Sequence, residues 1–222
     1  LFFVIILFGN SKEVTEIVES PFYSTSIVDL EKSNPSEEVL LGEGETYSLD
    51  ARFVKHMIDG KEVRMIGYNG QIPGPIIKVK EGETAYIEFT NNLDMETTVH
   101  WHGIRLKNEF DGVPDVTQDP VLPGESFTYE INFKDEGVYW YHPHIREDYQ
   151  QELGLYGNII VEPTEKDYYN AVSFEEYLIL DDISFEGDKI SSFDKDLITN
   201  SLMGRFGDIM LINGNSGFVM DV

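Results

Sequence analysis

The 222-residue chain contains no cysteine. It therefore has no disulfide, no thiolate metal ligand and no thiol nucleophile. Basic residues are also scarce, because 16 Lys and Arg face 41 Asp and Glu and leave a formal net charge of −25. This charge repels phosphate backbones and anionic lipids, which argues against nucleic acid as a partner. An acidic surface is typical of a soluble protein, and it would also suit cationic substrates, metal ions or a salty medium.

Long hydrophobic runs are absent too. No apolar run reaches the roughly 20 residues that a membrane-spanning helix needs. The apolar run LFFVIILFG at residues 1–9 has the length of a signal-peptide core. It predicts export, to a periplasm or to the extracellular medium. Because the chain starts with Leu1 and no basic stretch precedes the run, we interpret residues 1–11 as the remnant of a signal peptide. A buried amino-terminal strand is the alternative.

Composition and periodicity divide the rest of the chain into three parts. Residues 12–44 are rich in acidic residues, Ser and Thr and have weak periodicity, which predicts a linker. Residues 45–165 alternate in short segments between Gly, Pro, Asn and Asp turns, the pattern of an all-β sandwich. Residues 175–222 supply only two or three strands, too few to close a second sandwich. We therefore predict one complete domain followed by the truncated start of another.

Four of the five histidines fall in two His-x-His pairs. The pairs are His100-Trp101-His102 and His142-Pro143-His144. Random placement of five histidines would give roughly 0.1 such pairs per chain. In a strand, residues i and i+2 project from the same face about 6.5 Å apart, so two neighbouring strands would bring four imidazoles together. Pro143 lacks an amide donor, which predicts that the second pair lies at a sheet edge or strand end.

Neutral imidazole binds copper and zinc well, whereas calcium and magnesium prefer oxygen ligands. The two pairs therefore predict a transition-metal site. One alternative is four satisfied or surface histidines. Another is a hydrolytic zinc site in which three histidines hold the ion and activate a water. His56 has no partner two residues away and is predicted to be structural.

The string TTVHWHGIRLKNEFDGVPDVTQDPVLPGESFTYEINFKDEGVYWYHPH resembles the two copper-binding motifs of the first cupredoxin domain of multicopper oxidases, the laccase-like enzymes. Such enzymes pair an HWHG motif with a later His-x-His preceded by a YWYH-like strand. The resemblance extends upstream through YNGQIPGPIIKVKEGETAYIEFTNNL and downstream to MGRFGDIMLING, so it covers residues 45–222. It implies an all-β fold, with a cupredoxin-like Greek-key β-sandwich followed by an incomplete second cupredoxin domain.

Residue roles follow from this resemblance. His100 matches a ligand of the type 2 copper, while His102, His142 and His144 match ligands of the binuclear type 3 pair. Together they would form half of a trinuclear cluster that reduces dioxygen to water with electrons from a reducing substrate. Asp111 stands where the family has an acid that relays protons; a turn residue before Gly112 is an equally good interpretation.

The chain also departs from the family pattern. The other four cluster histidines, and the type 1 copper with its Cys and two His, belong to a carboxy-terminal cupredoxin domain that these residues do not include. The resemblance implies that this domain lies in the same chain or in a neighbouring subunit. We therefore predict the amino-terminal fragment of a copper-dependent oxidoreductase, inactive alone. The alternative is an exported copper-binding or copper-resistance protein without turnover.

Residues beside the two pairs have less specific signals. Trp101 and Trp140 flank the histidines and are predicted to pack in the sandwich core. The charged residues Arg146, Glu147 and Asp148 follow the second pair. They are typical of a solvated loop, although they could also orient the ligand imidazoles.

Overall fold

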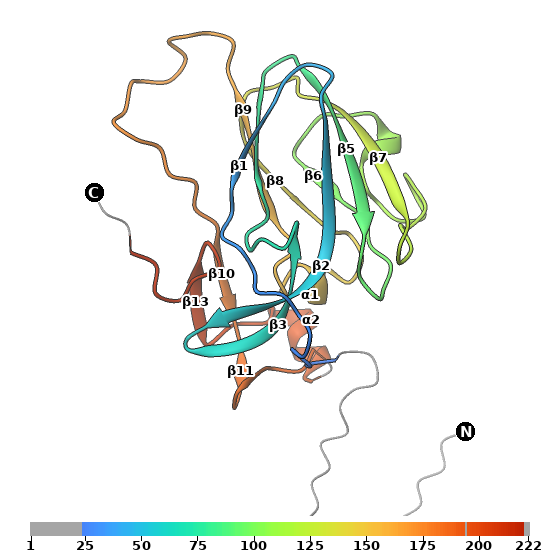
Figure 1. Cartoon of the computed structure of the whole chain (residues 1–222), viewed down its shortest axis with the longest axis vertical. Helices are drawn as coiled ribbons and strands as arrows, with labels where there is room; N and C mark the ends of the chain where they lie inside the picture. The colour runs from blue at the N-terminus through green and yellow to red at the C-terminus, as the bar shows by residue number, and fades with distance from the viewer. Residues whose placement is uncertain (1–23, 194, 220–222) are drawn as a thin grey trace, which may run out of the picture.

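The computed structural model describes residues 24–193 and 195–219. The predicted signal-peptide remnant at 1–11 lies outside these residues. Two β-sheets pack face to face, and their strands run side by side along the upper part of the molecule (Figure 1). One sheet has the order β3-β2-β5-β7, formed by β3 (Lys61–Tyr68), β2 (Thr46–Ile58), β5 (Thr84–Asn91) and β7 (Ser126–Asn132). The other has the order β1-β4-β9-β8-β6, formed by β1 (Glu38–Leu41), β4 (Ile76–Lys80), β9 (Gly157–Glu162), β8 (Gly137–His142) and β6 (His100–His102).

Alternating side chains build the core between the sheets. In β5, Ala85, Ile87 and Phe89 are fully buried, while the residues between them are more exposed. The opposite sheet contributes Ile77 and Val79 from β4, which belong to the same cluster. Burying each large apolar side chain stabilises the fold by about 1.5–3 kcal/mol. The predicted all-β sandwich is thus confirmed by the strand order and by its core.

Strand β1 lies within residues 12–44, the stretch predicted as a linker. It pairs in parallel with β4, with Glu38 opposite Ile76 and Leu41 opposite Val79. Only Leu41 of the four residues is buried, because β1 is an edge strand. A single buried position gives no alternating pattern, which is why the sequence did not reveal the strand.

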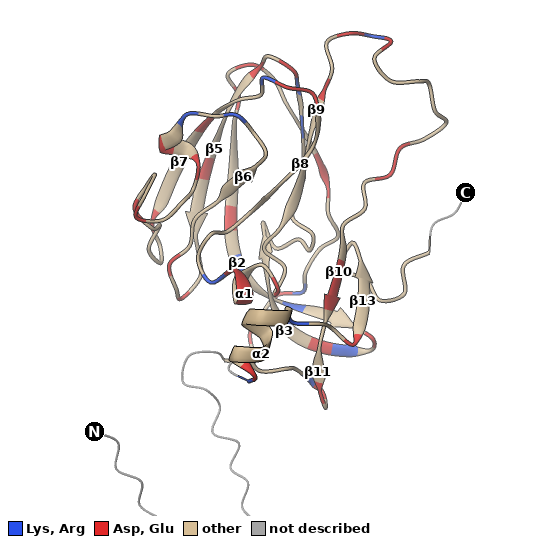
Figure 2. Cartoon of the chain, turned by 180° about the vertical axis from the view of Figure 1, so that it is seen from behind, with Lys and Arg blue, Asp and Glu red and all other residues tan. Residues whose placement is uncertain are grey.

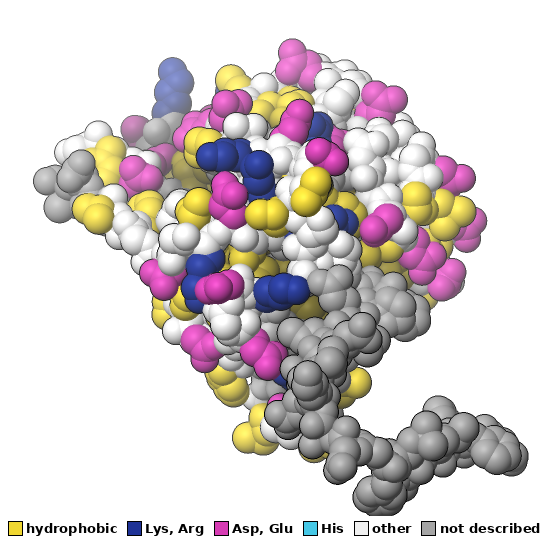
Figure 3. Space-filling model, turned by 60° about the horizontal axis from the view of Figure 1, so that its bottom comes forward, with side chains coloured by type: hydrophobic (Ala, Val, Ile, Leu, Met, Phe, Trp, Pro, Cys, Tyr) yellow, Lys and Arg dark blue, Asp and Glu magenta, His cyan; other side chains and the backbone are white. Residues whose placement is uncertain are grey.

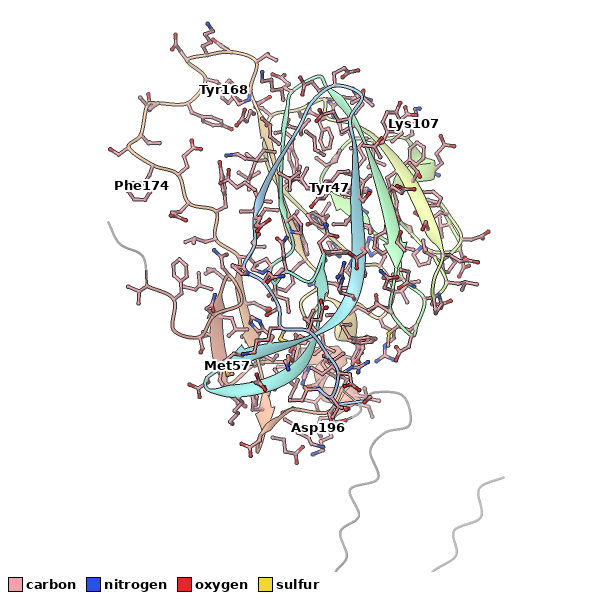
Figure 4. The ribbon with its side chains drawn as sticks, viewed as in Figure 1. Tyr47, Met57, Lys107, Tyr168, Phe174 and Asp196 are labelled. Carbon is pink, nitrogen blue, oxygen red and sulfur yellow. The ribbon has the colours of Figure 1, made fainter. Side chains whose placement is uncertain are left out.

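After β9, residues 163–179 contain no helix or strand, and all of them are described. This connection extends away from the sandwich and carries the exposed side chains of Tyr168 and Phe174 (Figure 4). It includes the polar stretch predicted as a domain boundary. That boundary, and the division into 45–165 and 175–222, stay predictions.

The remaining described elements are short. They are β10 (Leu180–Ile183), β11 (Phe185–Glu186), β12 (Lys189–Ile190), α2 (Leu197–Met203) and β13 (Ile209–Ile212), besides η1 (Asn108–Phe110) and α1 (Glu147–Gln150) within the first sandwich. Strands β10 and β13 pair antiparallel, as do β11 and β12, so the described residues after 179 form two two-stranded sheets. They pack against the far end of the β2–β3 hairpin, where Ile183 and Leu211 join a second apolar cluster with Val54, Ile58 and Met65. None of the described helices has the length and apolar character that crossing a membrane would require.

His56 connects this hairpin to the end of the described chain. Its Nδ1 lies 2.7 Å from Ser33 Oγ, and its Nε2 lies 2.8 Å from the carbonyl oxygen of Gly214. The carbonyl can only accept, so Nε2 carries the proton and Nδ1 accepts from the serine hydroxyl. Burial lowers the pKa of His56, and the neutral ring satisfies both partners. His56 is therefore a structural residue, and it lies far in sequence from the two pairs.

Charged side chains cover the outside of the molecule. Acidic residues are drawn along both sheets and over β10 (Figure 2). On the face that Figure 3 shows, Asp and Glu are interspersed with Lys, Arg and hydrophobic side chains. The acidic residues are thus distributed over these surfaces.

Glu152 is a partly buried carboxylate where the first sandwich meets β10, and it makes folding stability depend on pH. Its Oε1 accepts from Arg205 Nη1 at 3.2 Å. Burial raises the pKa of Glu152 from 4.5 to about 7, opposed by Arg205 and reinforced by Asp181 and Asp182. Because the folded-state pKa is the higher one, the ionised carboxylate disfavours folding. Stability is therefore lost as the pH rises from 4.5 through about 7.

Replacing Glu152 with Gln should remove this pH dependence. At about 1.4 kcal/mol per pKa unit, wild-type stability relative to Glu152→Gln should fall by on the order of 3 kcal/mol, as an upper limit, between about pH 4.5 and pH 7. Urea unfolding of both proteins at several pH values measures this difference. A constant difference across that range would show that Glu152 ionises as readily in the folded chain as in the unfolded one.

Candidate metal centre

Strands β6 and β8 bring the two His-x-His pairs together. They pair antiparallel, with His100 opposite His142 and His102 opposite Trp140. Strand β6 is the edge of its sheet, and β8 ends at His142, so Pro143 lies just past a strand end. This position requires no ladder hydrogen bond from Pro143 and confirms its predicted placement.

The four imidazole rings of the two pairs converge. The ring centroid of His100 lies 5.5 Å from that of His102, 5.4 Å from that of His142 and 4.3 Å from that of His144. The centroid of His142 lies 5.5 Å from that of His102 and 5.2 Å from that of His144. The predicted convergence is confirmed. His100, His102 and His142 each offer a ligand atom within 4.8 Å of the other two, and the described residues contain no other such group of three.

In three of these rings, the Nδ1 atom contacts an oxygen atom. Nδ1 of His100 lies 2.7 Å from the carbonyl oxygen of Asp111, and Nδ1 of His142 lies 2.9 Å from that of Pro143. Nδ1 of His144 contacts Oε1 of Glu147. Carbonyl and carboxylate oxygens only accept, so in a neutral ring Nδ1 carries the proton and Nε2 keeps its lone pair. Such outer partners are typical of metal-ligating histidines.

His102 differs from the other three. Its Nδ1 faces Nε2 of His142 at 3.2 Å. If both nitrogens carry lone pairs, this approach is repulsive unless a proton or a cation lies nearby. Several neutral nitrogen donors directed at a small volume match the ligand preference of copper or zinc, so the donor set fits a transition metal.

Burial favours the neutral form of His142 and His100. It lowers the pKa of His142 to about 4, with the Pro143 carbonyl opposing the shift and His100 and His144 reinforcing it. Burial also lowers the pKa of His100. Neutral imidazoles are the form that binds metal, so at neutral pH these two rings need not release a proton to become ligands.

The two tryptophans have different positions. Trp101 is fully buried in the sandwich core against Tyr129 and Tyr141, as predicted. Trp140 lies outside the core cluster and stacks on His142 at 4.0 Å and 22°, with His102 at 4.9 Å. The core prediction is therefore wrong for Trp140. Because Trp140 is two residues before His142, the strand period already placed both on one face.

Asp111 lies beside His100. It ends the 3₁₀ helix η1, and Gly112 follows with φ +74°, so it is a turn residue. Its carbonyl oxygen accepts from His100, and its Oδ1 lies 3.5 Å from the same Nδ1. The turn interpretation therefore describes the backbone, and proton relay by the carboxylate stays a prediction.

The charged residues after His144 differ in their contacts. Arg146 and Asp148 form an exposed ion pair, with Nε and Oδ1 2.8 Å apart. Glu147 instead contacts His144, which supports the interpretation that it orients a ring. The sequence did not predict Gln150, which is fully buried and accepts from Thr97 Oγ1 at 2.6 Å. No local pattern could reveal this contact, since the two residues are 53 positions apart.

Comparisons with known proteins agree with this arrangement. The multicopper oxidase family model matches residues 51–166. Multicopper oxidase MCE of Talaromyces pinophilus is 42% identical over 122 residues, and Copper resistance protein A of Pseudomonas syringae pv. tomato is 34% identical over 124 residues. These alignments cover 54% and 56% of this chain and 20% of each relative. The chain thus spans about a fifth of the length of these relatives.

A solved structure extends the likeness to the fold. The crystal structure of a multicopper oxidase from Pseudomonas thermotolerans superposes with a TM-score of 0.71 and 34% identity, over 80% of this chain and 42% of that one. The predicted cupredoxin-like β-sandwich is therefore confirmed, and copper is the metal that the family implies. Since the family model matches more than half of these residues, the chain belongs to the multicopper oxidase family.

Proposed function

We propose that this chain supplies half of the histidine ligands of a trinuclear copper site at which the whole protein reduces dioxygen to water. His100 would hold the type 2 copper, and His102, His142 and His144 would hold the type 3 pair. The observation that carries the proposal is the convergence of four rings, three of which have Nδ1 held by oxygen acceptors. That arrangement leaves Nε2 of His100, His142 and His144 as the donor atom.

Copper bound there would take up electrons one at a time and deliver them to dioxygen. The protein residues around it would fix the rings and supply protons. Asp111 is suited to the second task, because its carboxylate is about one-third exposed and lies next to the His100 ring. We propose that it transfers protons from solvent toward the site.

The proposed reaction needs partners beyond these residues. The chain has no cysteine, so it cannot form the thiolate-bound type 1 copper. We propose that a carboxy-terminal cupredoxin domain, in the same chain or a neighbouring subunit, supplies that copper and the other four histidines. A reducing substrate and dioxygen complete the reaction. The apolar run at residues 1–9 supports export of the protein.

A second candidate function is copper resistance without turnover. It is favoured by the similarity to Copper resistance protein A of Pseudomonas syringae pv. tomato. In that case the same histidines would sequester copper, and oxygen reduction would be absent.

Metal titration followed by oxygen-uptake measurements tests these proposals. The purified 222-residue chain should bind copper in preference to zinc, with the histidine ring signals perturbed in NMR spectra. In the whole protein, copper loading should produce oxygen uptake when a phenol or an aromatic amine is added. Copper binding without oxygen uptake in the whole protein would favour the resistance function. Preference for zinc, or no metal binding, would overturn the copper site.

A further inference from the structure

His144 is held differently from the other anchored rings. His100 and His142 each meet a neutral backbone carbonyl, whereas His144 meets the side-chain carboxylate of Glu147. His144 also lies beyond the end of β8, so no strand pairing fixes its backbone. A hydrogen bond to an ionised acceptor is roughly twice as strong as one between neutral groups. His144, whose backbone is not held by strand pairing, is therefore the anchored ring with a charged partner, Glu147.

The local backbone explains how Glu147 reaches this ring. Arg146 adopts the left-handed conformation at φ +45° and turns the chain, so that α1 begins at Glu147. This turn lets the carboxylate of Glu147 contact the ring of His144, three residues earlier in the chain. The exposed neighbour Asp148 instead pairs with Arg146, through two contacts of 2.8 and 2.9 Å.

Hydrogen bonds tie α1 to the residues just before β6. Gln150, the last residue of α1, accepts from Thr97 Oγ1 and donates from Nε2 to the carbonyl oxygen of Glu96 at 2.9 Å. On the other side of the turn, Thr98 Oγ1 accepts from the backbone N–H of His144 at 3.3 Å. Both ends of the segment from His144 to Gln150 are therefore hydrogen-bonded to residues 96–98, just before β6. Glu147 stands on a fixed element, although its side chain is half exposed.

We infer that Glu147 is a positioning residue for His144. Its carboxylate accepts the Nδ1 proton, selects the tautomer with the lone pair on Nε2 and holds the ring 4.3 Å from His100. This inference rests on the proposed function for the role of Nε2 as a copper ligand. Because a carboxylate partner also increases the basicity of the ring, it strengthens that ligand.

The test compares Glu147→Ala and Glu147→Gln with Asp148→Asn, a matched change of charge on the next residue. In the metal-free chain at about pH 8, where imidazole is neutral, nitrogen-detected NMR reports the tautomer of each ring. Wild type should show His144 with its proton on Nδ1. Glu147→Ala should show a mixture of tautomers, and Glu147→Gln should restore the wild-type tautomer in part, since its amide oxygen still accepts.

Copper titration provides the second readout. Glu147→Ala should weaken the affinity of the copper that His144 binds by about 10–100-fold, the usual cost of losing an outer partner of a ligand. Asp148→Asn should bind as wild type does. An unchanged His144 tautomer in Glu147→Ala would overturn the inference. Should the wild-type chain bind no copper, the proposed function fails, while the metal-free spectra still decide the role of Glu147.

Discussion

Replacing Gly112 with alanine is expected to destabilise the chain by roughly 3–5 kcal/mol and to release the His100 ring. Gly112 has φ +74°, and a Cβ there would lie 2.0 Å from the carbonyl oxygen of Val99 and 2.9 Å from the backbone nitrogen of His100. The neighbouring atoms are backbone, so they cannot rotate away. The strand that carries His100 must shift, and with it the Asp111 carbonyl that accepts from the ring.

Gly124 is a matched control for this substitution. Its φ is +81°, and a Cβ there would meet nothing within 4 Å. Gly124→Ala should therefore cost only the strain of the left-handed conformation, about 1 kcal/mol. Urea unfolding of the metal-free proteins measures both effects, and ring-nitrogen NMR follows the His100 tautomer. Equal losses of stability in the two variants would show that the contact with Val99 does not constrain residue 112.

The features that could be predicted from the sequence are those with a short period. Alternation identified β5 and β7, because each buries every second side chain against the core. It also identified β2, which alternates in two parts: Leu49 and Ala51 are buried first, and then Val54, His56 and Ile58. The same period of two predicted that the rings of His100 and His102, and of His142 and His144, would share one volume. The lack of an amide donor in Pro143 placed the second pair at a strand end. These inferences needed only the local backbone geometry and the expectation that the two segments lie side by side.

The features that could not be predicted depend on contacts between distant residues or on a single buried position. Strand β1 buries Leu41 alone, so it has no period. Gln150 becomes part of the site only because α1 folds back on Thr97. Trp140 had a usable signal, its spacing from His142, but an aromatic residue beside a strand end is equally typical of a core. Pairing of β6 with β8 decides between the two possibilities, because it places Trp140 opposite His102.

The largest loss of metal binding is expected from His142→Ala. His142 is the most buried ring of the cluster: it is 4% exposed, stacks on Trp140, and its Nε2 lies 3.2 Å from Nδ1 of His102. Its removal takes away one donor and also leaves His102 without the ring that faces it. Losing an outer partner of a ligand alone costs about 10–100-fold, so losing this ring should weaken copper binding by more than about 100-fold.

His56→Ala separates this effect from a general loss of stability. His56 is 8% exposed, similar to His142, and both of its ring nitrogens have polar partners, yet it does not belong to the group of histidines whose ligand atoms converge. Both variants remove a buried imidazole and leave a cavity, so both should unfold at lower urea concentration. Only His142→Ala should lose copper, because His56 uses its nitrogens to join Ser33 and Gly214. If His56→Ala lost copper to the same extent, weakened binding would report damage to the fold, and the four converging rings would no longer account for the metal.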